Sequence, residues 1–186
     1  MCGIIGYIGK KSTKDILLDS LELLEYRGYD SAGIALFPVG ANGPVVNKVA
    51  GRVSRLREVC AGLTDEACAG IGHTRWATHG GVSDENAHPH QNGRVTLVHN
   101  GIIENYKELV KEYDLKGKLI SETDTEVAAA VLNQLYDGDP EKALRELISL
   151  LKGTFAFAVI FADQPGKIFA VRNVSPIVVA MTEHDL

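Results

Sequence analysis

Short apolar runs near both ends of the chain and amphipathic segments in its middle predict an α+β fold. The short runs are bounded by glycine, proline or polar residues, which is typical of strands. They are residues 2–8, 31–37, 45–49, 69–74, 94–99, 154–162, 167–172 and 177–181. Helices are predicted from Ser12, which resembles a capping box with Asp15, to a break at residues 26–30, and over four later segments. Those segments are residues 52–63, 105–113, 123–136 and 140–151. This order favours a sandwich of sheets and helices over a regular βαβ winding.

The connections between these elements carry further signals. The polar stretch at residues 75–93 is longer than a simple connection between two elements requires, so we expect a functional loop there. Asn100-Gly101, followed by two isoleucines, predicts a hairpin turn. Thr123 is a predicted helix N-cap, and residues 163–166 are a predicted turn between two strands.

Composition narrows the classes of function. A chain of 186 residues, 45% of them hydrophobic, fits one domain of ordinary size. A net charge of −5 without a basic cluster argues against a nucleic-acid or anionic-membrane partner. No membrane-spanning run or secretory signal is visible, so we expect a cytoplasmic protein. Three cysteines without CxxC spacing argue against a disulfide framework or a zinc ribbon, and Cys60 and Cys68 are interpreted as small core residues.

Cys2 is the strongest candidate for chemistry. Removal of Met1 would leave a thiol and a free α-amine on one residue. Moving a proton from a thiol to an α-amine costs only about 1 kcal/mol at their reference values, so the amine can act as the base for the nucleophile. If Met1 stays, the base is lost. On position alone, the favoured interpretation of Cys2 is a small residue that opens a buried strand.

Histidines suggest a second hypothesis. Five of the six histidines fall between residues 73 and 99, so a transition-metal site is an alternative. Its ligands would be His79, His88, His90 and His99. No recognised ligand spacing is present, and a cysteine nucleophile with its own amine needs no metal. We therefore expect neither a metal nor another cofactor.

Six blocks of sequence, in order, resemble the glutaminase domain of the glucosamine-6-phosphate synthases, a family of class II glutamine amidotransferases. The blocks are residues 2–6, 26–33, 73–80, 86–90, 99–105 and 121–126. The resemblance weakens over residues 127–186. The resemblance implies a four-layer αββα sandwich of the N-terminal nucleophile hydrolase type. It also implies hydrolysis of the glutamine side-chain amide through a γ-glutamyl thioester.

The resemblance assigns roles to individual residues. Cys2 would be the nucleophile, and the side-chain amide of Asn100 with the backbone N–H of Gly101 would hold the oxyanion. Preformed donors of this kind are worth about 10² to 10³ in rate. Taken alone, Asn100 and Gly101 could simply form a structural turn.

Substrate binding is the second set of roles. Arg75 would bind the α-carboxylate of L-glutamine and Asp124 its ammonium, because a guanidinium fork matches a carboxylate and a carboxylate matches a cation. Thr78 and His79 would help to hold the carboxylate, and Trp76 would belong to a loop that closes over the pocket. Without the resemblance, Arg75 reads as a surface charge, Trp76 as a core aromatic and Asp124 as a first-turn helix residue.

Arg27 and His88 match family positions that support the site, although an arginine that ends a helix can simply interact with its carbonyl end.

The resemblance also bears on domain organisation. We expect residues 1–186 to form one glutaminase domain that is truncated at its C-terminus. The sugar-isomerase domains, which would bind fructose 6-phosphate and form a homodimer, are expected to be absent. Two other functions stay open: a catalytically silent regulatory or interaction module with the same fold, and a glutaminase that supplies a different ammonia acceptor.

Overall fold

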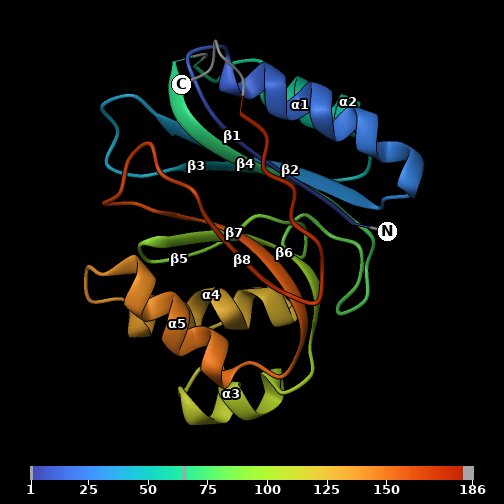
Figure 1. Cartoon of the computed structure of the whole chain (residues 1–186). Coiled ribbons are helices and arrows are strands. Elements are labelled where there is room, and N and C mark those ends of the chain that lie inside the picture. The colour runs from blue at the N-terminus through green and yellow to red at the C-terminus, as the bar shows by residue number, and fades with distance from the viewer. Residues whose placement is uncertain (1, 65, 182–186) are drawn as a thin grey trace.

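Two antiparallel sheets stacked face to face make up the centre of the protein (Figure 1). The computed structural model describes residues 2–64 and 66–181. The elements are β1 (Gly3–Ile8), α1 (Thr13–Leu24), the 3₁₀ turn η1 (Glu25–Arg27), β2 (Ser31–Pro38), β3 (Val45–Ala50), α2 (Val53–Val59), β4 (Ala67–Arg75), β5 (His90–Asn92), β6 (Val95–Ile103), α3 (Tyr106–Glu112), α4 (Asp124–Leu135), α5 (Pro140–Leu150), β7 (Gly153–Phe161) and β8 (Phe169–Asn173). Met1 and residues 182–186 lie outside the described residues, so the removal of Met1 and the truncation at the C-terminus stay predictions.

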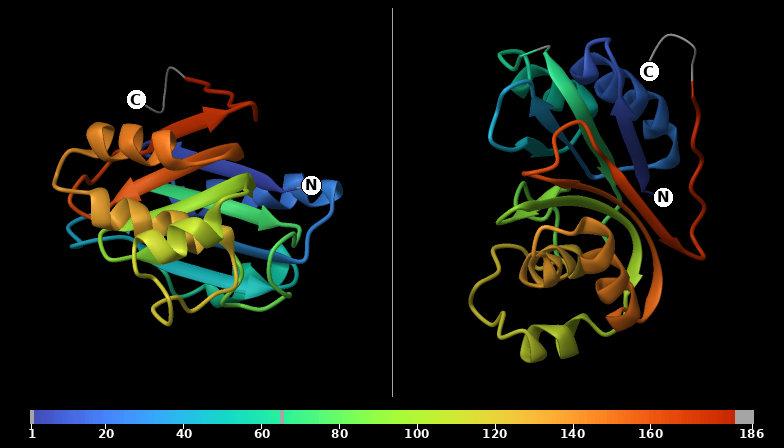
Figure 2. Two further views of the ribbon diagram at one scale, coloured as in Figure 1. Left: turned by 90° about the horizontal axis from the view of Figure 1, so that it is seen from below. Right: turned by 60° about the vertical axis from the view of Figure 1, so that its left-hand side comes forward.

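The layers follow the order helices, sheet, sheet, helices. One sheet has the strand order β1-β4-β2-β3 and is covered by α1 and α2, whereas the other has the order β5-β6-β7-β8 and is covered by α4 and α5 (Figures 1 and 2). Small and apolar side chains fill the space between the sheets. This cluster comprises Ala35, Phe37, Ala69, Ile71, Val98, Ala158 and Ile160. The predicted α+β, four-layer αββα architecture is therefore confirmed.

Side-chain alternation along β4 decides what faces the site. A Cβ added at Gly70 or Gly72 would lie within about 3 Å of Leu17 or Leu21 of α1, so these glycines let the helix pack closely on the sheet. Ile71 packs between the sheets. His73, two residues on, shares that face because successive strand residues alternate. His73 therefore faces the second sheet.

The helices begin where their capping residues predict. The Ser12 hydroxyl accepts from the N–H of Asp15 at 3.3 Å, and the Thr123 hydroxyl accepts from the N–H of Glu126 at 3.2 Å. Asp139 caps α5 with Pro140 in its first turn. Each cap satisfies a backbone donor that would otherwise have no partner at the helix start. None of the helices formed by the described residues has the length and apolarity that a membrane span requires.

Three local predictions were wrong. Asn100-Gly101 forms no hairpin turn, because β6 continues to Ile103 and pairs with β7 along its whole length. Residues 177–181 form no strand and are largely exposed, since no neighbouring strand pairs with them among the described residues. Strand β5 was missed because its residues are polar and belong to the long predicted loop.

Candidate active site

A cavity of about 1350 Å³ opens where the N-terminal end of β1 meets β4 and β6. All the site residues predicted from the sequence line it. They are Cys2, Arg27, Arg75, Trp76, Thr78, His79, His88, Asn100, Gly101 and Asp124. These residues are far apart in the chain, so the fold brings them together.

Strand pairing places the Cys2 thiol against the end of β4. Gly3 pairs with Thr74, so Cys2 lies beside Arg75 and Trp76. The backbone N–H of Trp76 donates to Cys2 Sγ at 3.2 Å. The thiol also donates to the Trp76 carbonyl oxygen at 3.5 Å, so both backbone groups of Trp76 hold the sulfur at the end of β4.

The Trp76 indole is not part of the core, because 54% of the residue is exposed. Its ring lies against Gly28, where an added Cβ would be 2.9 Å from Cζ3 and where φ is +87°. Glycine is therefore required at Gly28 both by its backbone and by the ring that covers it. The interpretation of Trp76 as a core aromatic was wrong.

Asn100 brings an amide from the second sheet to Cys2. Its Nδ2 donates to the Cys2 carbonyl oxygen at 3.4 Å, and its Oδ1 lies 2.9 Å from Nε2 of His73. The next residue, Gly101, has φ of +139°, and a Cβ there would overlap the carbonyl oxygen of Thr154. This strand position therefore accepts only glycine.

Asp124 is the first residue of α4 and is only 4% exposed. Its Oδ2 accepts from the backbone N–H of Ile103 at 2.8 Å, and its Oδ1 accepts no hydrogen bond from a described residue. The positive end of the α4 dipole stabilises this buried carboxylate. One carboxylate oxygen is thus held in place while the residue still faces the cavity. Its assignment as a first-turn helix residue and its predicted role in binding ammonium are compatible.

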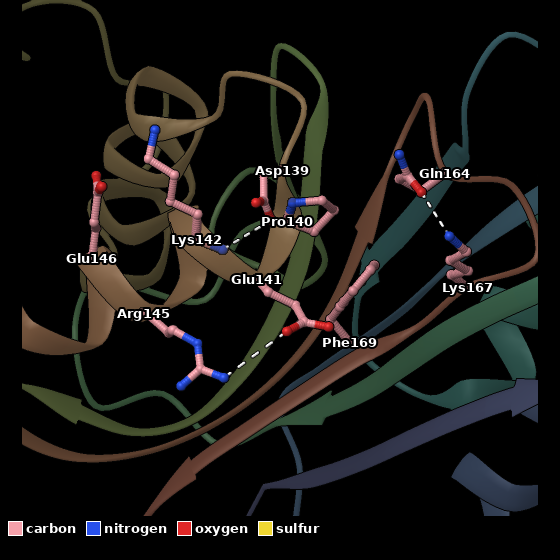
Figure 3. A pocket seen from close by; sticks show the side chains of 9 residues that line it. All are labelled: Asp139, Pro140, Glu141, Lys142, Arg145, Glu146, Gln164, Lys167 and Phe169. Atoms are coloured by element: carbon pink, nitrogen blue, oxygen red, sulfur yellow. Dashed lines mark hydrogen bonds and ion pairs between the residues drawn. The ribbon is translucent and has the colours of Figure 1, made fainter.

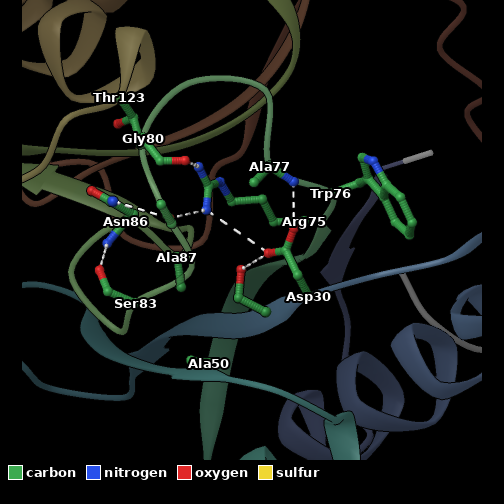
Figure 4. A network of polar contacts seen from close by, with 12 residues as sticks. Asp30, Ala50, Arg75, Trp76, Ala77, Gly80, Ser83, Asn86, Ala87 and Thr123 are labelled. Carbon is green, nitrogen blue, oxygen red and sulfur yellow. Dashed lines mark hydrogen bonds and ion pairs between the residues drawn. The ribbon is translucent and has the colours of Figure 1, made fainter.

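Arg75 is buried rather than a surface charge, and its guanidinium binds the loop that follows β4 (Figure 4). It donates to the carbonyl oxygen of His79 at 2.5 Å and to that of Gly81 at 3.1 Å, and it lies 3.8 Å from Oδ1 of Asp30. Nη2 also donates to the carbonyl oxygen of Gly80 at 3.4 Å, so of the five N–H groups of the guanidinium only Nε–H and one Nη1–H make no hydrogen bond with a described residue. In this structure Arg75 therefore fixes the loop, and its contact with a substrate carboxylate stays a prediction.

The long loop, predicted at residues 75–93, is anchored from several sides. Asp30 accepts from the N–H of Ala77 on one flank (Figure 4). Asn86 donates to the carbonyl oxygen of Gly81 at 3.1 Å and accepts from the N–H of Glu122 at 2.9 Å. These contacts tie the loop to the residue that precedes β2 and to the segment before α4, so the loop forms part of the wall of the site.

Lys48, on β3, holds the far end of the same loop. Its ammonium donates to the carbonyl oxygens of Glu85 and Ala87 at 2.9 and 2.8 Å. Burial lowers the pKa of Lys48 to about 8. The acceptors are uncharged carbonyl groups, so they offset only part of the cost of desolvating the charge.

Four buried histidines lie in or beside the cavity, and three of them, His73, His88 and His99, line it. The rings of His73 and His88 are stacked, with their centroids 4.2 Å apart. The rings of His88 and His90 meet edge to face, with their centroids 4.9 Å apart. Burial lowers the pKa of His73 to about 3 and that of His99 to about 4, and it lowers the pKa values of His88 and His90 well below the usual value. All four are neutral near pH 7. Within the described ranges, no group of three or more histidine, cysteine or acidic side chains is placed to hold a metal ion.

A second cavity, of about 610 Å³, lies between α5 and the turn that joins β7 to β8 (Figure 3). Its charged side chains contact one another, as Arg145 does with Glu141 at 3.9 Å, and Lys167 contacts Gln164 at 2.9 Å. None of the residues predicted for chemistry lines it. The chemistry is therefore concentrated in the larger cavity.

Several residues that build the site were assigned no role from the sequence. They are His73, Asp30, Asn86 and Glu122. All four fall inside the blocks that carry the family resemblance, but their contacts join distant segments. The alternation of side chains along β4 could have predicted that His73 faces the second sheet. No local pattern could have predicted that Asn100 is its hydrogen-bond partner.

Comparison with known families matches residues 73–185 to the model described as "Glutamine amidotransferase domain". The match covers more than half of the chain and begins at His73, so it includes most of the cavity residues outside β1 and η1.

Curated relatives named glutamine–fructose-6-phosphate aminotransferase (isomerizing) resemble the whole chain. The protein from Symbiobacterium thermophilum is 50% identical over 100% of this chain and 31% of its own length. That from Bacillus subtilis is 52% identical over 97% of this chain and 30% of its own length. That from Thermococcus kodakarensis is 47% identical over 100% of this chain and 31% of its own length. The chain thus spans about a third of the length of these relatives.

Solved structures share the fold. Glutamine phosphoribosylpyrophosphate amidotransferase from B. subtilis superposes with a TM-score of 0.70 at 23% identity, over 87% of this chain and 35% of that one. A structure described as the allosteric regulatory enzyme of purine biosynthesis gives 0.73 at 24% identity, over 87% of this chain and 36% of that one. At these identities the likeness concerns the fold alone.

Proposed function

Given that the chain belongs to the glutamine amidotransferase domain family, we propose that its larger cavity hydrolyses the side-chain amide of glutamine with Cys2 as the nucleophile. The observation that carries this proposal is the convergence on Cys2 of an N–H donor from Trp76 and an amide from Asn100. The products are glutamate and ammonia.

Glutamine is held at its two charged ends. Asp124 binds the ammonium with the oxygen that Ile103 leaves unused. The remaining donors of Arg75, together with Thr78 and His79, bind the α-carboxylate at the cavity wall. Opposite charges at the two ends select an amino acid of defined length and orientation.

The reaction proceeds by two acyl-transfer steps. The Cys2 sulfur attacks the side-chain carbonyl carbon, and its proton passes to the free α-amine of Cys2 and then to the leaving nitrogen. Ammonia departs and leaves a thioester. Water then attacks the thioester, which releases glutamate and restores the thiol. Asn100 Nδ2 and the Gly101 N–H stabilise the oxyanion in both steps.

We propose that the ammonia is used by another part of a longer protein. The curated relatives are about three times as long as this chain, and their name specifies fructose 6-phosphate. We propose that residues 1–186 are the glutaminase domain of such an enzyme, which makes glucosamine 6-phosphate in hexosamine synthesis. We also propose that the whole enzyme is a cytoplasmic homodimer. The free thiols of Cys2, Cys60 and Cys68 support a reducing compartment.

Steady-state glutaminase assays test the proposal. Wild-type protein should release glutamate from glutamine, Cys2→Ala should not, and Cys68→Ala should behave as wild type because that half-buried thiol lies outside the cavity. Absence of glutamate release from wild-type protein that binds glutamine would favour the silent-module alternative.

A further inference from the structure

The side chain of Asn100 lies between two groups that together fix which way its amide points. On one side is the carbonyl oxygen of Cys2, 3.4 Å from the amide, and on the other is Nε2 of His73, 2.9 Å away. Only one orientation of the amide satisfies both contacts.

The Cys2 carbonyl oxygen settles the orientation. A carbonyl oxygen can only accept hydrogen bonds, so the amide atom that faces it must be the donor Nδ2. The other amide atom, Oδ1, must then face His73. Because Oδ1 only accepts, Nε2 of His73 must carry a proton.

The surroundings of His73 make it a neutral donor. The residue is fully buried, its ring stacks on that of His88, and the Arg75 guanidinium is near enough to oppose a positive charge. Desolvation is the largest cause, and it lowers the pKa of His73 to about 3. A neutral ring protonated at Nε2 has a bare Nδ1, and Nδ1 has no hydrogen-bond partner among the described residues.

We propose that His73 is a positioning residue for the reaction: its Nε2–H holds the Asn100 amide with Nδ2 turned toward the Cys2 nucleophile. The inference rests on the proposed function, in which Asn100 Nδ2 stabilises the oxyanion. His73 acts through Asn100 and needs no contact with glutamine.

Without the His73 donor, the Asn100 side-chain amide could rotate by about 180° and exchange the positions of Nδ2 and Oδ1. In the reversed orientation Oδ1 would point toward the oxyanion, and a stabilising donor would be replaced by a repelling acceptor. Removing one donor of this type lowers kcat by about 10² to 10³, which sets the upper range for removing its support. We expect His73→Leu to lower kcat by about 10- to 100-fold and to change KM little, because the contacts with the charged ends of glutamine remain.

His73→Gln is the matched variant. The Nε2 of glutamine reaches about as far as that of histidine and is always a donor, so this variant should recover most of the lost kcat. A double-mutant cycle with Asn100→Ala separates positioning from a general structural role. His73→Leu should cost nearly nothing further once Asn100 is alanine, whereas a structural defect would lower kcat equally in both backgrounds.

The tautomer can be measured without any variant. Nitrogen-15 NMR of the native protein at neutral pH should find the proton of His73 on Nε2. A proton on Nδ1, a wild-type kcat in His73→Leu, or equal losses in the two backgrounds would each overturn the proposal. This measurement decides the matter even if His73→Leu fails to fold.

The outcomes also separate this inference from the proposed function. If wild-type protein hydrolyses glutamine and Asn100→Ala lowers kcat, but His73→Leu does not, the positioning role fails and the glutaminase assignment stands. If wild-type protein has no glutaminase activity, the assignment fails, and the NMR result still tests the orientation of the amide.

Discussion

Mild acid should destabilise the folded protein through its buried histidines. His73 and His99 are neutral in the folded state, because burial lowers their pKa values to about 3 and about 4. The charged and titratable groups near His73 are His88, His99 and Arg75. Those near His99 are Asp124 and His79. In the unfolded chain both would titrate near the usual histidine value of about 6.5.

The sign follows from proton binding. Below a pH of about 6.5 these histidines bind protons in the unfolded state but stay neutral in the folded state. The free energy of unfolding is therefore at its full value above a pH of about 6.5 and decreases as the pH falls toward the folded pKa values. At pH 5, about 1.5 units below the unfolded pKa, each histidine costs about 2 kcal/mol. His73 and His99 together therefore remove about 4 kcal/mol, and His88 and His90 act in the same direction. That loss is a large part of a typical domain stability of about 5 to 15 kcal/mol.

Urea unfolding at pH 7.5 and pH 5.0, followed by circular dichroism, measures the loss. His99→Asn is the matched control, because its amide can keep the contact that Nδ1 makes with the Thr125 hydroxyl at 3.0 Å without titrating. The control should reduce the difference between the two pH values by about 2 kcal/mol. Unfolding free energies that agree at the two pH values in the wild type would refute the reasoning.

Other predictions concern the site itself. Asn100→Ala should lower kcat by about 10² to 10³ with little change in KM, and steady-state kinetics with an unchanged kcat would remove Asn100 from the oxyanion site. Asp124→Asn keeps an acceptor for the Ile103 N–H and loses the charge, so KM for glutamine should rise by about 10- to 100-fold; a normal KM would argue against its contact with the ammonium. Gly101→Ala should lower the unfolding free energy by about 1 to 3 kcal/mol or more, whereas Gly62→Ala, with open space around it, should change it little; equal effects would contradict the strain assigned to Gly101.

The sequence predicted the fold class because local patterns and capping residues are strong here. Ser12 and Thr123 cap the helices that they were expected to cap. The Asn100-Gly101 prediction failed because this dipeptide is most often a turn, whereas here pairing with Phe155 and Ala156 keeps it inside a strand. Tertiary pairing, which a short window cannot show, overrode the local signal.

The residues predicted for the site lie together in the structure, and the roles assigned to them stay predictions. Every predicted residue lines one cavity, since the blocks of sequence meet at the ends of β1, β4 and β6. Arg75 was expected to bind the α-carboxylate of the substrate, and in the structure it binds the loop carbonyl oxygens of His79 and Gly81. His73 received no role, because its partner Asn100 lies in the other sheet.

Treatment with an electrophilic glutamine analogue, followed by intact-mass and peptide analysis, tests the central claim most directly. The account predicts one adduct per chain on Cys2, in a peptide that begins with that cysteine, and protection by excess glutamine. An adduct on Cys60 or Cys68, or active protein that retains Met1, would contradict it.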